Sequence, residues 1–140
     1  MKYLAYILLF FLISCAENEP VLNIKQPNIY SIGFGSCLHQ EDPMLIFRSI
    51  KNENYDLFLM LGDNVYGDTN SDDMVELKDA YNEQRNNFNE MKLNFPFEAI
   101  WDDHDYGKND GGNEYIYKEE AKELFLDFWK IDQSDIRRSR

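Results

Sequence analysis

The stretch Asp56-Leu57-Phe58-Leu59-Met60-Leu61, followed at once by Gly62 and Asp63, decides the fold of this 140-residue chain. A continuous apolar run of this length is typical of a strand buried on both faces of a parallel sheet. Two shorter β-branched and aromatic runs, residues 29–34 and 97–101, predict one strand before it in the chain and one after it.

Helical periodicity follows each predicted strand. Asp42 before Pro43 predicts the start of a first helix, because proline is favoured at the first helical position. Residues 71–91 and 113–130 predict two longer helices. The order strand, loop, helix therefore repeats three times, which predicts an α/β fold with a mostly parallel sheet in a single domain.

Every glycine of the chain lies in one of three clusters, and each cluster follows a predicted strand. The clusters are Gly33 and Gly35, then Gly62 and Gly67, then Gly107, Gly111 and Gly112. Ligands of parallel α/β sheets bind at the carboxyl ends of the strands. We therefore expect the three glycine-containing loops to lie side by side on one edge of the sheet.

These loops carry thiol, phenol, imidazole and many carboxylate groups. Negative groups crowded at one sheet edge are unstable unless they take up protons or a cation holds them. A cation is the simplest solution. Thiolate and phenolate together with carboxylate favour ferric iron, and additional carboxylates suit calcium or another divalent metal.

Three motifs follow one another in the loops. They are Gly35-Ser36-Cys37, Gly62-Asp63-Asn64-Val65-Tyr66-Gly67-Asp68, and Trp101-Asp102-Asp103-His104-Asp105-Tyr106-Gly107-Lys108-Asn109-Asp110. In this order they resemble the alkaline phosphatase D (PhoD-like) family of metallophosphoesterases across residues 29–130. The middle motif is similar to the Gly-Asp-x-x-Tyr signature shared with purple acid phosphatases. The resemblance implies the front half of a calcineurin-like αββα sandwich and an exported phosphomonoesterase or phosphodiesterase with a site for Fe3+ and Ca2+.

The resemblance also implies roles for individual residues. Cys37 would be a ferric ligand, Asp63 would bridge two metals, and Tyr66 would bind iron as a phenolate. Asp103 stands where related enzymes carry an asparagine that binds the second metal. A metal-bound hydroxide would attack the phosphate ester, while the catalytic His104 protonates the leaving oxygen or hydrogen-bonds the phosphate.

Other polar residues of the motifs have supporting roles in this interpretation. Asn64 is expected to touch a phosphate oxygen of the substrate. Asp68, Asn109 and Asp110 are expected to support the ligands or to shape turns. Asp102 and Asp105 fit a place in the site and a place on a solvated surface equally well. His39 is expected to be an exposed loop residue. Trp101 is expected to lie in the core.

The first segment resembles an export signal. A short basic start precedes an apolar run over residues 3–13, which is shorter than the roughly 20 residues that span a bilayer. Leu12-Ile13-Ser14-Cys15 is similar to a bacterial lipobox. This implies a lipoprotein signal peptide over residues 1–14, lipidation of Cys15, a tether over residues 15–28, and anchoring in the bacterial cell envelope. The alternative is a plain signal peptide with a chance cysteine.

Charge restricts the partners of the chain. The net charge is −12, from 26 acidic and 14 basic residues. Nucleic acids and anionic lipid surfaces are bound with Lys and Arg, so the balance argues against both. The expected partner, a phosphate-ester substrate, is what the resemblance to the phosphatase family implies.

The resemblance covers only part of a metallophosphoesterase domain. Such domains bring further ligands from His-bearing loops of a second half, whereas this chain has two histidines in all. We therefore expect residues 29–140 to form a partial domain, with one sheet face uncovered and weak phosphatase activity or none by itself. The alternative is a non-catalytic, membrane-anchored module that keeps half of the site as a cation binder.

Overall fold

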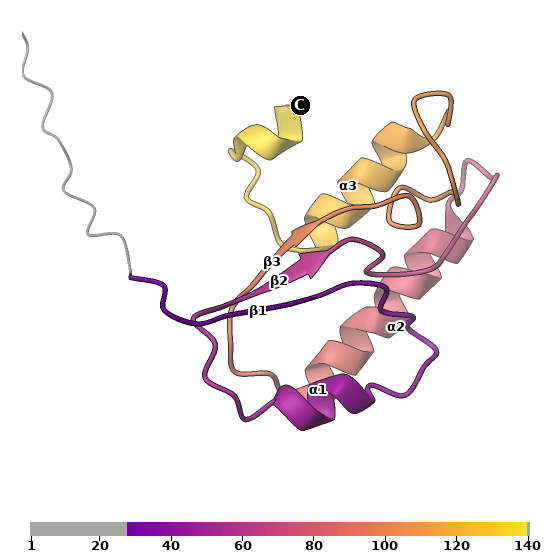
Figure 1. The fold of residues 1–140 in the computed structure, drawn as a ribbon. Coiled ribbons are helices and arrows are strands. Elements are labelled where there is room, and N and C mark those ends of the chain that lie inside the picture. The colour runs from indigo at the N-terminus through magenta and orange to yellow at the C-terminus, as the bar shows by residue number, and fades with distance from the viewer. Residues whose placement is uncertain (1–27, 140) are drawn as a thin grey trace, which may run out of the picture.

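A computed structural model describes residues 28–139 of the chain. Its strands are β1 (Ile32–Gly35), β2 (Leu57–Leu61) and β3 (Phe97–Ile100), and they form one parallel sheet in the order β1-β2-β3. The strands alternate with the helices α1 (Leu45–Ile50), α2 (Val75–Met91) and α3 (Lys118–Phe128), and a short 3-10 turn, η1 (Ile136–Ser139), follows (Figure 1). The predicted α/β class and the threefold strand-helix order are confirmed.

The central position of β2 follows from its apolar sequence. β2 pairs with β1 on one side and with β3 on the other, so that Phe58 lies between Gly33 and Phe97. Phe58 and Met60 are buried, whereas Leu61 is 42% exposed. The prediction of burial on both faces was therefore wrong, because only the face that carries Phe58 and Met60 is covered.

All three helices begin later than the sequence predicts. α1 has Met44 at its N-cap without a side-chain cap, so Asp42 does not start this helix. Met74 adopts a left-handed backbone conformation, with φ of 54°, and α2 starts only after it. Before α3, buried Tyr115 donates a hydrogen bond to the carbonyl of Thr69 and holds its segment in a loop. Such a contact with a distant part of the chain overrides the helical periodicity of the local sequence.

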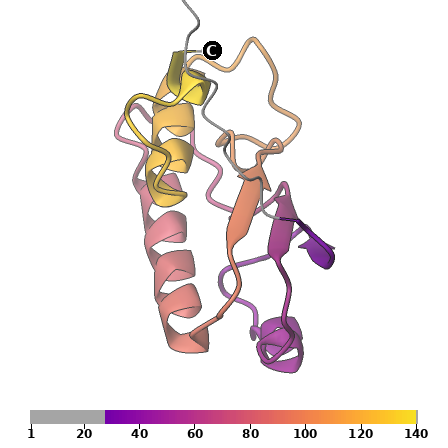
Figure 2. The same cartoon turned by 90° about the vertical axis from the view of Figure 1, so that its left-hand side faces the viewer.

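The core lies between the sheet and the helices. α1 places Phe47 against Phe58, and α2 packs on α3 through Tyr81 and Phe128. Figure 2 shows α2 and α3 side by side on one side of the strands. The buried residues form two hydrophobic clusters, one that contains Phe58 and one that contains Tyr81. Phe88 and Trp129 pack against both clusters and join them into a continuous core.

The opposite face of the sheet is open. The alternate residues of the strands point to this face, and several of them are large, apolar and exposed. They are Ile32, Phe34, Leu61 and Ile100. The expectation of an uncovered sheet face is therefore confirmed for the part of the chain that the structure describes.

The expected signal peptide, the lipidated Cys15 and almost all of the tether lie outside the described residues. Within residues 28–139, none of the helices combines the length and the apolar character that crossing a bilayer requires.

Candidate metal centre

The three glycine-containing loops meet at the carboxyl edge of the sheet. The backbone N–H of Cys37 donates to the carbonyl of Gly62 at 3.2 Å, and that of Leu38 donates to the carbonyl of Asp63 at 2.8 Å. These bonds join the first loop to the second. The expected convergence of the loops is therefore confirmed, and it brings residues far apart in the chain to one place.

Asp105 joins the second loop to the third. Its carboxylate accepts hydrogen bonds from the backbone N–H of Asn64, at 3.0 and 3.2 Å, and from that of Asp102, at 3.1 Å. Asp105 is fully buried. Burial raises the pKa of its carboxyl group to about 6, although these hydrogen bonds act in the opposite direction. Asp105 therefore does not lie on a solvated surface, and its carboxylate holds the backbone of the two loops together.

Asn64 has a different place from the one expected. It is fully buried, and its side-chain amide donates to the carbonyl of Ile100 at 3.0 Å. Its backbone carbonyl accepts a hydrogen bond from Gln84. These contacts anchor Asn64 between the loops, and its Oδ1 is buried without a hydrogen-bond partner among the described residues.

Asp63, Asp103 and His104 form the group best suited to hold a cation. One ligand atom from each lies within 4.8 Å of the other two. Metal–ligand distances in proteins are roughly 2.0–2.6 Å, so two ligands of one ion lie at most about 5.2 Å apart, and the spacing of these atoms is compatible with ligands of a single ion. Asp63 Oδ1 is buried and has no hydrogen-bond partner among the described residues. An orphaned carboxylate oxygen of this kind is costly unless a cation compensates it.

The backbone at the centre is strained. Asp63 and Cys37 both adopt left-handed conformations, with φ of 51° and 57°. This conformation is uncommon for residues other than glycine and is frequent at functional sites. The strain thus falls on two of the residues that the sequence singled out as ligands.

Tyr66 and Cys37 approach the centre through Asp63. The Tyr66 hydroxyl donates to Asp63 Oδ2 at 3.1 Å, and the Cys37 thiol donates to the same oxygen at 3.6 Å. Burial raises the pKa of Tyr66, and the hydrogen bonds with Asp63 and Cys37 raise it further. The phenol therefore keeps its proton in the cation-free protein. Cys37 contacts Asp63 but does not belong to the group of three.

His104 is held by Asp68. Its Nδ1 lies 2.9 Å from Asp68 Oδ1. Burial acts to lower the pKa of His104, but Asp68, Asp103 and Asp63 together outweigh it and raise the pKa. With Nδ1 engaged, Nε2 is the ring nitrogen that can face a ligand or a substrate. Asp68 is therefore the side chain that orients the His104 ring.

Asp103 is oriented by the turn that follows it. Its side chain accepts hydrogen bonds from the backbone N–H of Asp110, at 2.6 Å, and of His104, at 3.1 Å. The bond from Asp110 is the main reason that the pKa of Asp103 is lowered. Asn109 donates to the Asp110 carboxylate. Asn109 and Asp110 therefore shape the turn that holds Asp103.

Sequence reasoning missed three supports of Tyr66 and its loop. Gln40 makes two hydrogen bonds with the backbone of Tyr66, and His39 stacks on the Tyr66 ring with centroids 4.8 Å apart. Gln84 is fully buried and donates to the carbonyls of Leu38 and Asn64. The signal for Gln84 was its place on the apolar face of α2, since a polar residue there needs partners.

Comparison of the chain with models of known protein families, with curated proteins and with solved structures gives no match. The function proposed below therefore rests on the sequence motifs and on the geometry of the loops.

Proposed function

We propose that residues 28–139 carry part of the active site of a metal-dependent phosphoesterase that resembles alkaline phosphatase D. The observation that carries the proposal is the group of Asp63, Asp103 and His104, with ligand atoms within 4.8 Å of one another and with one carboxylate oxygen of Asp63 buried and unpaired among the described residues. Crowded carboxylates beside an orphaned oxygen favour a cation.

In this proposal Asp63 and Asp103 hold the cation. Tyr66 and Cys37, which both contact Asp63, complete the donor set after losing their protons. These donor types suit ferric iron, and further carboxylates suit calcium or another divalent ion. When bound, the cation supplies charge neutralisation for the transferred phosphoryl group and lowers the pKa of water.

His104 has one free ring nitrogen, so it serves either as a ligand or as a proton donor. We assign it the second role, so that Asp63 and Asp103 are the two members of the group of three that hold the cation. Asp68 and the neighbouring carboxylates favour the imidazolium form, since they raise the pKa of His104. Its Nε2–H can then donate to the oxygen that leaves phosphorus. Asp68 is a positioning residue, because it acts through His104.

The proposal includes the place of the domain in the whole protein. The open apolar face of the three-stranded sheet supports its assignment as the front half of an αββα sandwich. The lipobox-like sequence before Cys15 supports export and lipid anchoring in the bacterial cell envelope. Metabolic labelling with a fatty acid tests the anchor, and the label should be lost in Cys15→Ala.

The direct test combines cation binding with hydrolysis. The purified chain is titrated with Fe3+, Ca2+ and Mn2+, and bound metal is measured by equilibrium dialysis. Hydrolysis of an aryl phosphate and of an aryl phosphodiester is then measured in the loaded protein. We expect saturable binding that is lost in Asp63→Asn and retained in the matched control Glu53→Gln.

The outcomes separate the proposal from its alternative. Binding with cation-dependent hydrolysis supports a phosphoesterase. Binding without hydrolysis supports the non-catalytic cation-binding module. Equal cation binding by Asp63→Asn and the unchanged chain would contradict both.

A further inference from the structure

A hollow of about 350 Å3 lies beside the candidate metal centre. Its side-chain walls come from the segment after β3, with the backbone of residues 111–112 closing one side. The wall residues are Trp101, Asp102, Asp103, Tyr106 and Asn113. Because Asp103 also belongs to the group that can hold a cation, the hollow and the metal centre share a wall.

The hollow has a rigid aromatic wall. Trp101, which the sequence placed in the core, is 39% exposed. Its ring meets Tyr106 edge to face, with centroids 5.8 Å apart, and packs against Phe125 of α3 at 5.4 Å. A ring supported in this way loses little conformational freedom when it packs against a flat ligand. Pockets with aromatic walls and a few polar groups are typical of small-molecule sites.

The rim of the hollow is acidic. Asp102 is exposed, and its Oδ1 accepts a hydrogen bond from the backbone N–H of Asp103 at 3.0 Å. This bond and the contact of its own N–H with Asp105 hold Asp102 in place. None of the described residues that line the hollow is basic. The rim therefore favours a ligand that carries a positively charged amino group and disfavours a ligand that carries a carboxylate there.

We propose that this hollow binds the organic part of the substrate, an aromatic ring that carries an amino group. The inference rests on the proposed function, in which the cation held by Asp63 and Asp103 would take the phosphate of the same molecule. Trp101 and Tyr106 take the ring, and Asp102 takes the amino group. The shared wall at Asp103 keeps the ring close to the phosphorus atom, so the substrate class is an amino-bearing aryl or arylalkyl phosphate ester.

The test uses Trp101 as its reporter and needs no cation. The chain has two tryptophans, so Trp129→Phe leaves Trp101 alone. Trp129 Nε1 is buried without a hydrogen-bond partner among the described residues, so phenylalanine removes a group that is costly to bury. The emission of this variant is titrated with phenethylamine and with 3-phenylpropanoate. We expect saturable binding of the amine and markedly weaker binding of the carboxylate.

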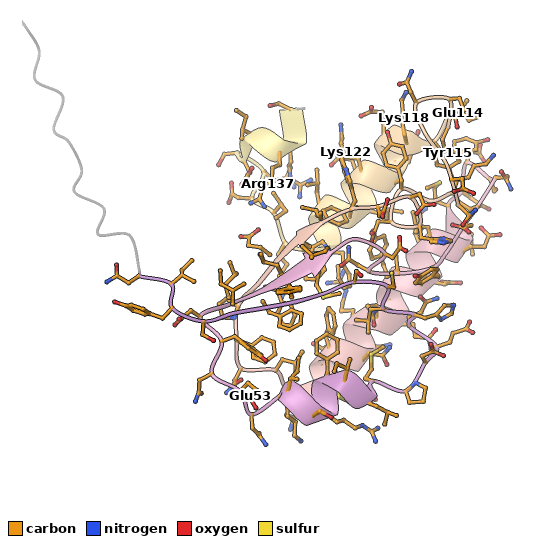
Figure 3. The ribbon with its side chains drawn as sticks, viewed as in Figure 1. Glu53, Glu114, Tyr115, Lys118, Lys122 and Arg137 are labelled. Carbon is orange, nitrogen blue, oxygen red and sulfur yellow. The ribbon has the colours of Figure 1, made fainter. Side chains whose placement is uncertain are left out.

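Two variants assign the contacts. Asp102→Asn should weaken phenethylamine binding about two- to five-fold, as expected for an exposed ion pair. Tyr106→Leu should weaken the binding of both probes. Glu53→Gln is the matched control and should change neither, because Glu53 lies near α1, away from the loop that carries Glu114 and Tyr115 (Figure 3).

Saturation transfer to the ring protons of phenethylamine repeats the test on the unsubstituted chain, should Trp129→Phe fail to fold. Equal affinity for the two probes, or no binding of either, would overturn the inference. Cation binding is measured separately by dialysis. If the unsubstituted chain binds phenethylamine but no cation, the proposed function is overturned. If it binds a cation but not phenethylamine, only the ring site is overturned.

Discussion

Both carboxylate oxygens of Asp105 lie within hydrogen-bonding distance of the backbone N–H of Asn64, at 3.0 and 3.2 Å. Asn64 directly follows Asp63, and Asp105 directly follows His104. This single side chain therefore sets the spacing between the two loops that supply the candidate metal centre.

The anchoring role of Asp105 predicts a large loss of stability on truncation. Asp105→Ala leaves the buried N–H of Asn64 and the partly buried N–H of Asp102 without an acceptor, which should lower the free energy of unfolding by about 2–4 kcal/mol. Asp105→Asn should cost less, because its amide oxygen still accepts. Urea unfolding followed by circular dichroism measures both. The exposed Asp79→Ala is the control, and an equal effect of Asp79→Ala and Asp105→Ala would contradict the role.

The raised pKa of Asp105 predicts a pH dependence of stability. Its folded-state pKa of about 6 exceeds the ordinary value of 3.8, so the native state binds more protons than the unfolded state between these values. The contribution of Asp105 to stability therefore increases as the pH falls from about 6 to about 4. Relative to Asp105→Asn, the unsubstituted chain should gain about 2 kcal/mol over this range. Urea unfolding in EDTA across the range provides the measurement. A difference between the two chains that does not change with pH would rule out this titration.

The contact between Tyr66 and Asp63 predicts a spectroscopic signature. Ferric iron bound by a phenolate gives a visible charge-transfer band, and Tyr66→Phe should abolish it. Tyr106→Phe removes a phenol from the neighbouring loop and should leave the band unchanged. Absorption spectra of the iron-loaded proteins decide the question, and a band that survives in Tyr66→Phe would exclude Tyr66 as a ligand.

The bond between Asp68 and His104 predicts a change in a measurable pKa. Asp68→Asn removes one of the charges that raise the pKa of His104, so this pKa should fall. NMR titration of the histidine ring protons in the metal-free chain measures it, with signals assigned through His39→Gln. Asp72→Asn is the control on an exposed position. A pKa of His104 that is the same with and without the Asp68 charge would refute the pairing.

Replacing phenylalanine by alanine should lower the free energy of unfolding much more on the covered face of the sheet than on the open face. Phe58 is buried, so Phe58→Ala should lower the free energy of unfolding by about 3–5 kcal/mol or prevent folding. Phe34 is 72% exposed on the opposite face, so Phe34→Ala should change it by less than about 0.5 kcal/mol. Urea unfolding compares the two chains. Similar losses would mean that the open face is covered in solution.

Much of the architecture could be predicted from local pattern. The apolar run that forms β2 and the shorter runs around it predict three parallel strands, and glycine-containing motifs after them predict convergent loops. The same patterns did not indicate that helix α2 starts only at Val75, because the left-handed Met74 follows from contacts of its loop. They also did not indicate that Trp101 is partly exposed, because the part of its ring that Phe125 covers depends on tertiary packing.

The sequence by itself determined the order of elements, the chemistry of the loops and their common edge, because hydrophobic period and glycine position are local properties. Only the tertiary structure decided which acidic residues of the loops are buried and which are exposed. Asp102 and Asp105 are equivalent in the sequence motif, yet one is exposed and the other fully buried. The difference arises because Asp105 meets the backbone of Asn64, 41 positions away in the chain, and burial depends on such distant partners.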